Sequence, residues 1–129
     1  MGTNYPRIEN LAITKNMNNY ATKFLNKVVN VKVDRPLGSK HSKHDIYYSF
    51  NYGYIPGELA PGGEEVDAYI LGVFEPVEEF TGKCIAIIHR LDDDDDELIV
   101  APDGVDYSNE QILSLVEFQE RFFKSIVIR

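Results

Sequence analysis

Short apolar segments divide the chain into several predicted strands. Residues 29–33 (Val-Asn-Val-Lys-Val) alternate apolar and polar side chains, which predicts a strand that ends at Asp34-Arg35-Pro36. The runs Val66–Phe74 and Cys84–His89 are rich in valine or isoleucine and predict buried strands. Asn51–Pro56 is expected to be a loop or a strand end, because a glycine and a proline interrupt it. Three shorter extended segments are also expected: Ile46–Phe50, Leu98–Ala101 and Ser125–Ile128.

Helical spacing predicts one helix near each end of the chain. Near the start, Asn18–Lys27 carries apolar side chains at helical intervals. Near the end, Ser108 precedes Gln111 by three residues, which is a capping box, and apolar side chains follow at Ile112, Leu115, Val116, Phe122 and Phe123. Short strands with a helix at each end favour an α+β fold, a small closed or nearly closed sheet with helices packed outside it.

Composition places the chain among globular proteins and limits its partners. It has 129 residues, 43% hydrophobic and 26% charged, which suits a single domain spanning residues 1–129. The formal net charge of −8 disfavours binding to nucleic acid or to an anionic membrane, because like charges repel. The single cysteine, Cys84, excludes an intramolecular disulfide and favours a reducing compartment, so we expect a cytoplasmic protein. No apolar run approaches the roughly 20 residues that span a bilayer.

Charge is unevenly distributed along the chain. Lysine, arginine and histidine dominate residues 32–44, whereas residues 58–110 are strongly acidic, with Lys83 and Arg90 as the basic residues among them. Two such stretches in a small domain can pack against each other. They can also form a site for a complex of a metal ion with an anion, which needs both signs of charge.

Carboxylates near predicted strand ends are the strongest candidates for chemistry. Asp67 lies inside an otherwise apolar run, where a lone buried carboxylate is costly unless it is paired or binds a metal. Asp92–Asp96 and Glu97 join two apolar runs, and for such a charge run alone a solvated hairpin turn is the favoured explanation. A solvated turn does not explain Asp67. Hard divalent cations bind where several carboxylates converge, so Glu64, Asp67 and the acidic loop are candidate ligands.

Three motifs together resemble the soluble inorganic pyrophosphatases of family I. They match in order and spacing: Asn51-Tyr-Gly-Tyr-Ile-Pro56, Gly62-Gly-Glu-Glu-Val-Asp67, and the acidic loop running into Leu98-Ile-Val-Ala-Pro102. Residues 33–39 are similar to a compact, short-chain branch of that family. The resemblance implies a five-stranded OB-like barrel with flanking N- and C-terminal helices. It also implies hydrolysis of inorganic diphosphate to two phosphates, with Mg²⁺ (or Mn²⁺) as cofactor, and a homo-oligomeric assembly.

The resemblance also implies a role for individual residues. Asp67 matches a metal ligand and the candidate base for the attacking water, and Tyr52 matches a tyrosine near the phosphate. The further metal ligands would be Glu64, Asp92 and Asp95. The substrate-binding residues would be Arg35, Lys40 and Lys124.

Two departures from the family pattern leave alternatives open. Gly62 stands in a slot that usually holds an aspartate, and Glu97 stands where a lysine is common. The chain could instead hydrolyse another small phosphoanhydride. It could also be a non-catalytic relative that binds metal or phosphate without turnover.

Overall fold

The computed structural model describes residues 20–92 and 95–129. Its elements are the 3₁₀ helix η3 (Tyr20–Phe24), β1 (Val28–Arg35), β2 (Asn51–Leu59), β3 (Glu65–Ile70), β4 (Glu79–Arg90), β5 (Asp96–Ala101), α2 (Asn109–Glu120) and β6 (Ser125–Ile128). Among the described residues, no helix is long and apolar enough to cross a membrane.

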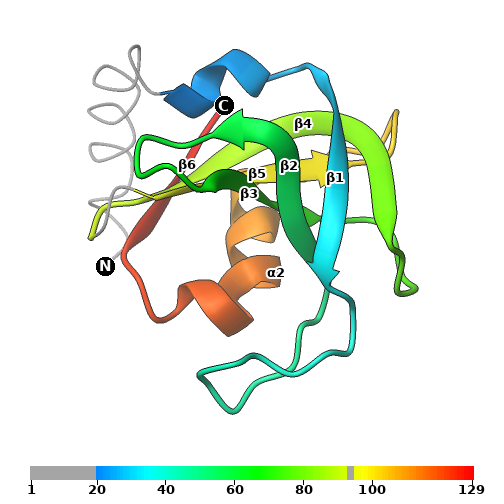
Figure 1. The fold of residues 1–129 in the computed structure, drawn as a ribbon, viewed down its shortest axis with the longest axis vertical. Helices are drawn as coiled ribbons and strands as arrows, with labels where there is room; N and C mark the ends of the chain where they lie inside the picture. Colours follow the sequence, from blue (N-terminus) through cyan, green and yellow to red (C-terminus); the bar gives the residue numbers. More distant parts are fainter. Residues whose placement is uncertain (1–19, 93–94) are drawn as a thin grey trace.

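Five strands close into a barrel. The strand order is β1-β2-β3-β5-β4-β6, and β1 pairs a second time, with β4, which closes the ring. Only the β3–β5 pair is parallel within this sheet, and β6 adds to the far edge of β4. Helix α2 lies below the barrel (Figure 1). The predicted α+β fold with a five-stranded OB-like barrel is therefore confirmed.

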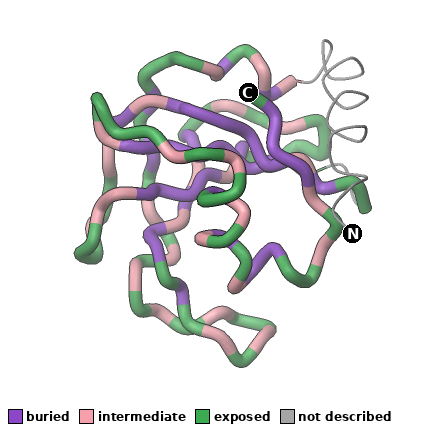
Figure 2. The backbone as a smooth tube through the Cα atoms, turned by 180° about the vertical axis from the view of Figure 1, so that it is seen from behind, coloured by how far each residue is buried: buried purple, intermediate pink, exposed green. Residues whose placement is uncertain are grey.

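Successive side chains of each strand point to opposite faces, so the buried apolar residues form two clusters, one on each face of the sheet. Within β3, Val66 and Ala68 point into the barrel, whereas Tyr69 belongs to a second cluster that includes the α2 residues Ile112 and Val116. The buried segments accordingly follow the strands, and the connecting turns are exposed (Figure 2). Asp67 lies on the same side of β3 as Tyr69, so it points away from the barrel interior.

The C-terminal helix begins as its capping box predicts. The Ser108 hydroxyl accepts a hydrogen bond from the Gln111 backbone at 3.1 Å, and the Gln111 side chain accepts one from the Ser108 backbone at 2.8 Å. The helix ends at Glu120, so Phe122 and Phe123 lie in the segment that follows it. The predicted strand Ser125–Ile128 is confirmed as β6.

The N-terminal helix is shorter than predicted in the part that the structure describes. A 3₁₀ helix covers Tyr20–Phe24, and Asn26 then adopts a positive φ of 65°. The backbone N–H of Asn26 donates to Cys84 at 2.8 Å, so the chain turns there to pair with β4. This pairing ends the helical segment before Lys27. Residues 18 and 19 lie outside the described residues.

The structure also differs from the prediction in the two segments that precede β3. Asn51–Pro56, expected to be a loop or a strand end, forms most of β2, and its register with β3 shifts beyond Tyr54, where Gly57 has a φ of 80°. Gly53 is required there, because a Cβ would lie 1.9 Å from the Lys32 carbonyl oxygen of β1. In contrast, Ile46–Phe50 is mostly irregular, with one isolated bridge between Tyr47 and Lys40.

Candidate functional site

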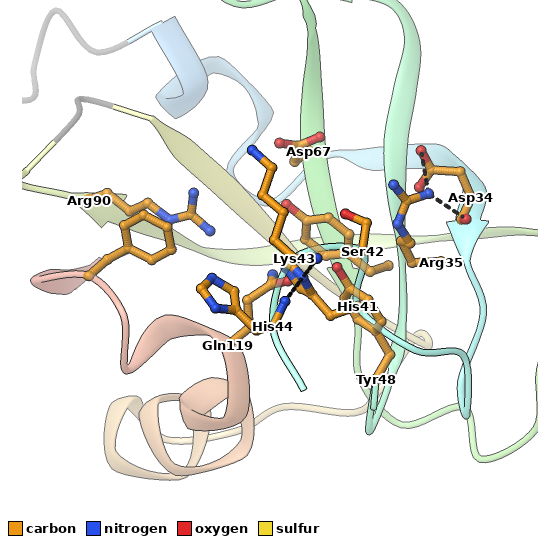
Figure 3. Close-up of a pocket in the computed structure, with 12 residues that line it drawn as sticks. Asp34, Arg35, His41, Ser42, Lys43, His44, Tyr48, Asp67, Arg90 and Gln119 are labelled. Carbon is orange, nitrogen blue, oxygen red and sulfur yellow. Dashed lines mark hydrogen bonds and ion pairs between the residues drawn. The ribbon is translucent and has the colours of Figure 1, made fainter. Parts of the chain in front are cut away.

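A basic cavity opens on the outer side of the barrel, beside β3. It has a volume of about 310 Å³ and is shown in Figure 3. The loop after β1, the strands β2 to β4 and the end of α2 all contribute to its wall. Its lining residues are Asp34, Arg35, His41, Ser42, Lys43, His44, Tyr48, Tyr52, Asp67, Arg90, Gln119 and Phe123.

A second, acidic cavity lies on the other side of Asp67. Its volume is about 160 Å³. The turn before β3 and the connection between β4 and β5 supply its carboxylates, so segments about 30 residues apart in sequence meet there. Its lining residues are Tyr20, Ala60, Gly62, Glu64, Glu65, Val66, Asp67, Asp95 and Asp96. Asp67 therefore faces both cavities.

The environment of Asp67 favours its protonated form. Burial raises the pKa of the Asp67 carboxyl to about 6 from an ordinary value of 3.8. A hydrogen bond from the Tyr52 hydroxyl and the positive charge of Arg90 act in the opposite direction, since both stabilise the carboxylate. A carboxyl with a pKa near 6 is suited to accept a proton at neutral pH.

An ion-pair cluster lies next to Asp67 and anchors the end of α2. The Arg90 guanidinium donates to both oxygens of Glu120, from Nε at 3.1 Å and from Nη2 at 2.8 Å. Its Nη2 also lies 2.8 Å from Glu97 Oε2, and the Phe123 ring lies 3.8 Å from Cζ. The Tyr69 hydroxyl donates to Glu120 at 2.7 Å. Because such a cluster is buried, loss of one partner leaves an uncompensated charge and costs about 3–5 kcal/mol.

Glu97 is the most deeply buried charged group of this cluster. It is fully buried on β5, in register with Asp67 on the neighbouring parallel strand β3. Burial and the charges of Glu120 and Asp67 raise the pKa of the Glu97 carboxyl well above its ordinary value, although Arg90 opposes the shift.

The loop between β1 and β2 is ordered by its histidines. His41 Nδ1 accepts hydrogen bonds from the backbone N–H groups of Lys43 and His44, at 2.9 and 3.2 Å. The His44 ring stacks on Phe122 with 3.8 Å between ring centroids, which ties the loop to the segment after α2. In this conformation the Lys43 side chain extends toward Asp67 (Figure 3).

The donor set of the acidic cavity fits a hard divalent cation in its chemistry. Carboxylate oxygens are the ligands that Mg²⁺ and Mn²⁺ prefer. Asp96 Oδ2 is buried and has no hydrogen-bond partner among the described residues, while Oδ1 lies 2.6 Å from His89 Nδ1. Within the described residues, however, no group of three or more His, Cys, Asp or Glu side chains is close enough to enclose an ion. The carboxylates would therefore have to rotate inward on binding.

Five of the residues that the resemblance implies come together at the two cavities. Arg35 and Tyr52 line the basic cavity, Glu64 and Asp95 line the acidic one, and Asp67 lines both. Their roles remain predictions, but their positions agree with a joint site for a cation and an anion.

The other three implied residues lie elsewhere. Lys40 is paired with Asp45 at 3.5 Å and does not line the basic cavity. Lys124 is exposed, and its backbone N–H donates to the Asp92 carboxylate at 3.3 Å, at the connection between β4 and β5. Asp92 does not line the acidic cavity. Residues 93 and 94 of the acidic loop lie outside the described residues.

Sequence reasoning misses several residues that form the basic cavity. The resemblance points to Lys40 rather than Lys43, because spacing alone does not reveal how a loop folds back. Arg90 ends an apolar run, as Asp67 interrupts one, and this same pattern could have identified it. Glu120 comes after the helical apolar positions, and no sequence pattern marks it as a buried partner of Arg90.

Several solved structures with the same fold are inorganic pyrophosphatases. The enzyme from Ehrlichia chaffeensis is 20% identical with a TM-score of 0.61, over 78% of this chain and 84% of that one. The Coxiella burnetii enzyme is 17% identical with a TM-score of 0.59, over 78% and 83%. The Helicobacter pylori enzyme is 15% identical with a TM-score of 0.56, over 78% and 81%. No protein-family model and no curated protein sequence matches the chain. The chain thus shares the fold of bacterial inorganic pyrophosphatases.

Proposed function

We propose that the protein hydrolyses inorganic diphosphate to two phosphates with the help of a divalent cation. The observation that supports this most directly is the position of Asp67 between an acidic and a basic cavity. Diphosphate carries several negative charges, so its hydrolysis needs groups that gather cations and groups that bind phosphate oxygens. The fold shared with inorganic pyrophosphatases makes diphosphate the first substrate to test.

On the acidic side, Glu64, Asp67 and Asp95 would hold Mg²⁺ or Mn²⁺. When bound, such a cation lowers the pKa of a nearby water and neutralises phosphate oxygens. Asp67 would accept a proton from the attacking water, the role that the resemblance implies for it. The Tyr52 hydroxyl would hold the Asp67 carboxylate in place through the hydrogen bond between them.

On the basic side, Arg35 and Lys43 would bind the phosphate groups. Both line the cavity, and Lys43 extends toward Asp67 from the loop opposite it (Figure 3). Their positive charges stabilise the charge that develops on the departing phosphate. Positioning and electrostatic stabilisation supply most of the rate enhancement in phosphoryl transfer. Lys40, Lys124 and Asp92 remain predicted contributors, as does a homo-oligomeric assembly.

The test is phosphate release from diphosphate with Mg²⁺, with Mn²⁺ and with chelator. We expect cation-dependent release, and a loss of at least about 10²-fold in Asp67→Asn, because loss of a general base typically costs about 10²–10⁴-fold. Asp103→Asn makes the same charge change at an exposed position outside both cavities, and it should retain wild-type activity. Wild-type activity in Asp67→Asn would overturn the assignment of the site.

A second candidate function is binding of a phosphate-containing anion without turnover. It is favoured by the absence of a pre-formed group of three ligands among the described residues, and by Gly62 in place of a carboxylate. In that case no phosphate would be released with either cation, while phosphate would still raise the free energy of unfolding by binding the folded state.

A further inference from the structure

We propose that Arg90 is an anion-binding residue of the basic cavity, where its guanidinium holds one phosphate group. The proposal rests on the proposed function for the identity of the anion. Arg90 is the last residue of β4 and enters the cavity from the side opposite Arg35, which ends β1 (Figure 3). The two arginines therefore offer donors from opposite walls of one cavity, an arrangement suited to an anion that carries two phosphate groups.

The Arg90 side chain is held rigidly. It is 8% exposed, it donates to both oxygens of Glu120, and its guanidinium lies against the Phe123 ring. Glu120 is itself held by hydrogen bonds from Tyr69 at 2.7 Å and from Ser125 at 3.1 Å. A guanidinium fixed in this way loses little conformational entropy when it binds a ligand, which makes it an effective anion receptor.

One edge of the guanidinium remains available for a ligand. Nε and Nη2 are used by Glu120 and Glu97, whereas Nη1 makes no hydrogen bond to any described residue. Arg90 lines the basic cavity together with Asp67 and Tyr52, so its side chain borders the predicted site of attack. Neutralisation of the buried carboxylates Glu97 and Glu120 does not by itself require Arg90 to line the cavity.

Cations outnumber carboxylates among the residues that line the cavity, with Arg35, Lys43 and Arg90 against Asp34 and Asp67, and this balance favours an anion. Arg35 and Lys43 face it from the β1–β2 loop region, and Arg90 faces it from β4. The carboxylates paired with Arg90 lie behind it, on β5 and at the end of α2, rather than among the cavity-lining residues. Phosphate oxygens match the planar donors of arginine and form charge-assisted hydrogen bonds with them.

The proposal is tested by calorimetric titration of the cation-free protein with inorganic phosphate, which requires no turnover. Arg90→Gln is combined with Glu120→Gln, so that the Glu120 carboxylate is not left buried without its partner, and the amide that replaces it retains an oxygen for Tyr69. We expect this double variant to bind phosphate roughly ten- to hundredfold more weakly, the size expected when hydrogen bonds to a charged group are lost. Glu97→Gln removes a carboxyl group behind Arg90, and it should bind phosphate at least as tightly as wild type.

A matched control removes another ion pair that lines a different cavity. Arg129 Nη2 lies 2.6 Å from Asp106 Oδ1, and both residues line a separate cavity of about 290 Å³. Arg129→Gln with Asp106→Asn should leave phosphate binding unchanged. Wild-type phosphate affinity in the Arg90/Glu120 variant, or no phosphate binding by the wild-type protein, would overturn the proposal.

A measurement on the wild-type protein covers the case in which the double variant does not fold. The guanidinium ¹⁵N resonance of Arg90 is followed by NMR during phosphate titration, and we expect it to shift to saturation together with that of Arg35. An unchanged Arg90 signal at saturating phosphate would contradict the proposal. If Arg90 binds phosphate but no diphosphate is hydrolysed, the proposed function fails and the anion site stands.

Discussion

The two cavities on either side of Asp67 differ in charge and in the parts of the chain that build them. The basic cavity is walled by the β1–β2 loop, by aromatic rings and by the end of α2. The acidic cavity is walled by the turn before β3 and by the β4–β5 connection, both rich in carboxylates. Closure of the barrel brings these segments to opposite sides of one strand. The basic and acidic stretches are separate along the sequence, and the fold brings them together so that both meet at Asp67.

The largest expected effect within this comparison is on the basic side. Arg35→Gln combined with Lys43→Gln removes two of its cations, and we expect the KM for diphosphate to rise by about 10²-fold, about tenfold for each lost contact with a charged group. The Mg²⁺ concentration for half-maximal activity should change much less. Lys40→Gln serves as the control, since Lys40 is paired with Asp45 outside the cavity. An equal loss in Lys40→Gln would show that the loop binds substrate in another conformation.

On the acidic side, two aspartates of the same hairpin provide an internal comparison. Asp95 lines the acidic cavity, whereas Asp92 accepts a hydrogen bond from the Lys124 backbone and does not line it. We expect Asp95→Asn to raise the Mg²⁺ concentration for half-maximal activity about tenfold, because one charge-assisted contact is lost. Asp92→Asn should change this concentration less. Metal titration of the activity measures both. Equal shifts in the two variants would place both side chains at the cation.

The smallest expected effect is on stability. Asp67→Asn, which should lower the activity, should raise the free energy of unfolding. Burial raises the pKa of Asp67 to about 6 from an ordinary value of 3.8. Between these values the folded protein binds more protons than the unfolded chain, so ionisation of Asp67 destabilises the fold as pH rises, and this cost is complete above about pH 6.

Asp67→Asn should therefore raise the free energy of unfolding by about 1–3 kcal/mol at pH 8 and by little below pH 4. Urea unfolding at both pH values, in the presence of chelator, measures the difference. A gain of the same size at pH 4 would show that the buried charge is not its cause.

The sequence predicts those parts of the fold that are determined by interactions within a single short segment. The capping box at Ser108 fixes the start of α2, because both of its hydrogen bonds lie within four residues. The strand at Asn51–Pro56 escapes prediction, because the close approach of β1 that requires Gly53 is a tertiary contact. The length of the N-terminal helix is overestimated for the same reason, since pairing with Cys84 on β4 redirects the chain at Asn26.

The same limit explains which site residues could be predicted. Asp67 stands out because a carboxylate within an apolar run has no explanation as a solvated residue. Lys43 could not be distinguished from Lys40, because the histidine hydrogen bonds that orient the loop are not visible as a pattern. The partnership of Arg90 with Glu120 joins residues 30 positions apart, and no spacing rule predicts it.

The most direct test of the central claim measures whether Asp67 couples the two cavities. Phosphate binding is titrated by calorimetry with and without saturating Mg²⁺, in wild type and in Asp67→Asn. We expect Mg²⁺ to tighten phosphate binding by wild type, and we expect this tightening to be lost in the variant although phosphate still binds. The same Mg²⁺-dependent tightening in Asp67→Asn would contradict the claim that Asp67 joins the cation side to the anion side.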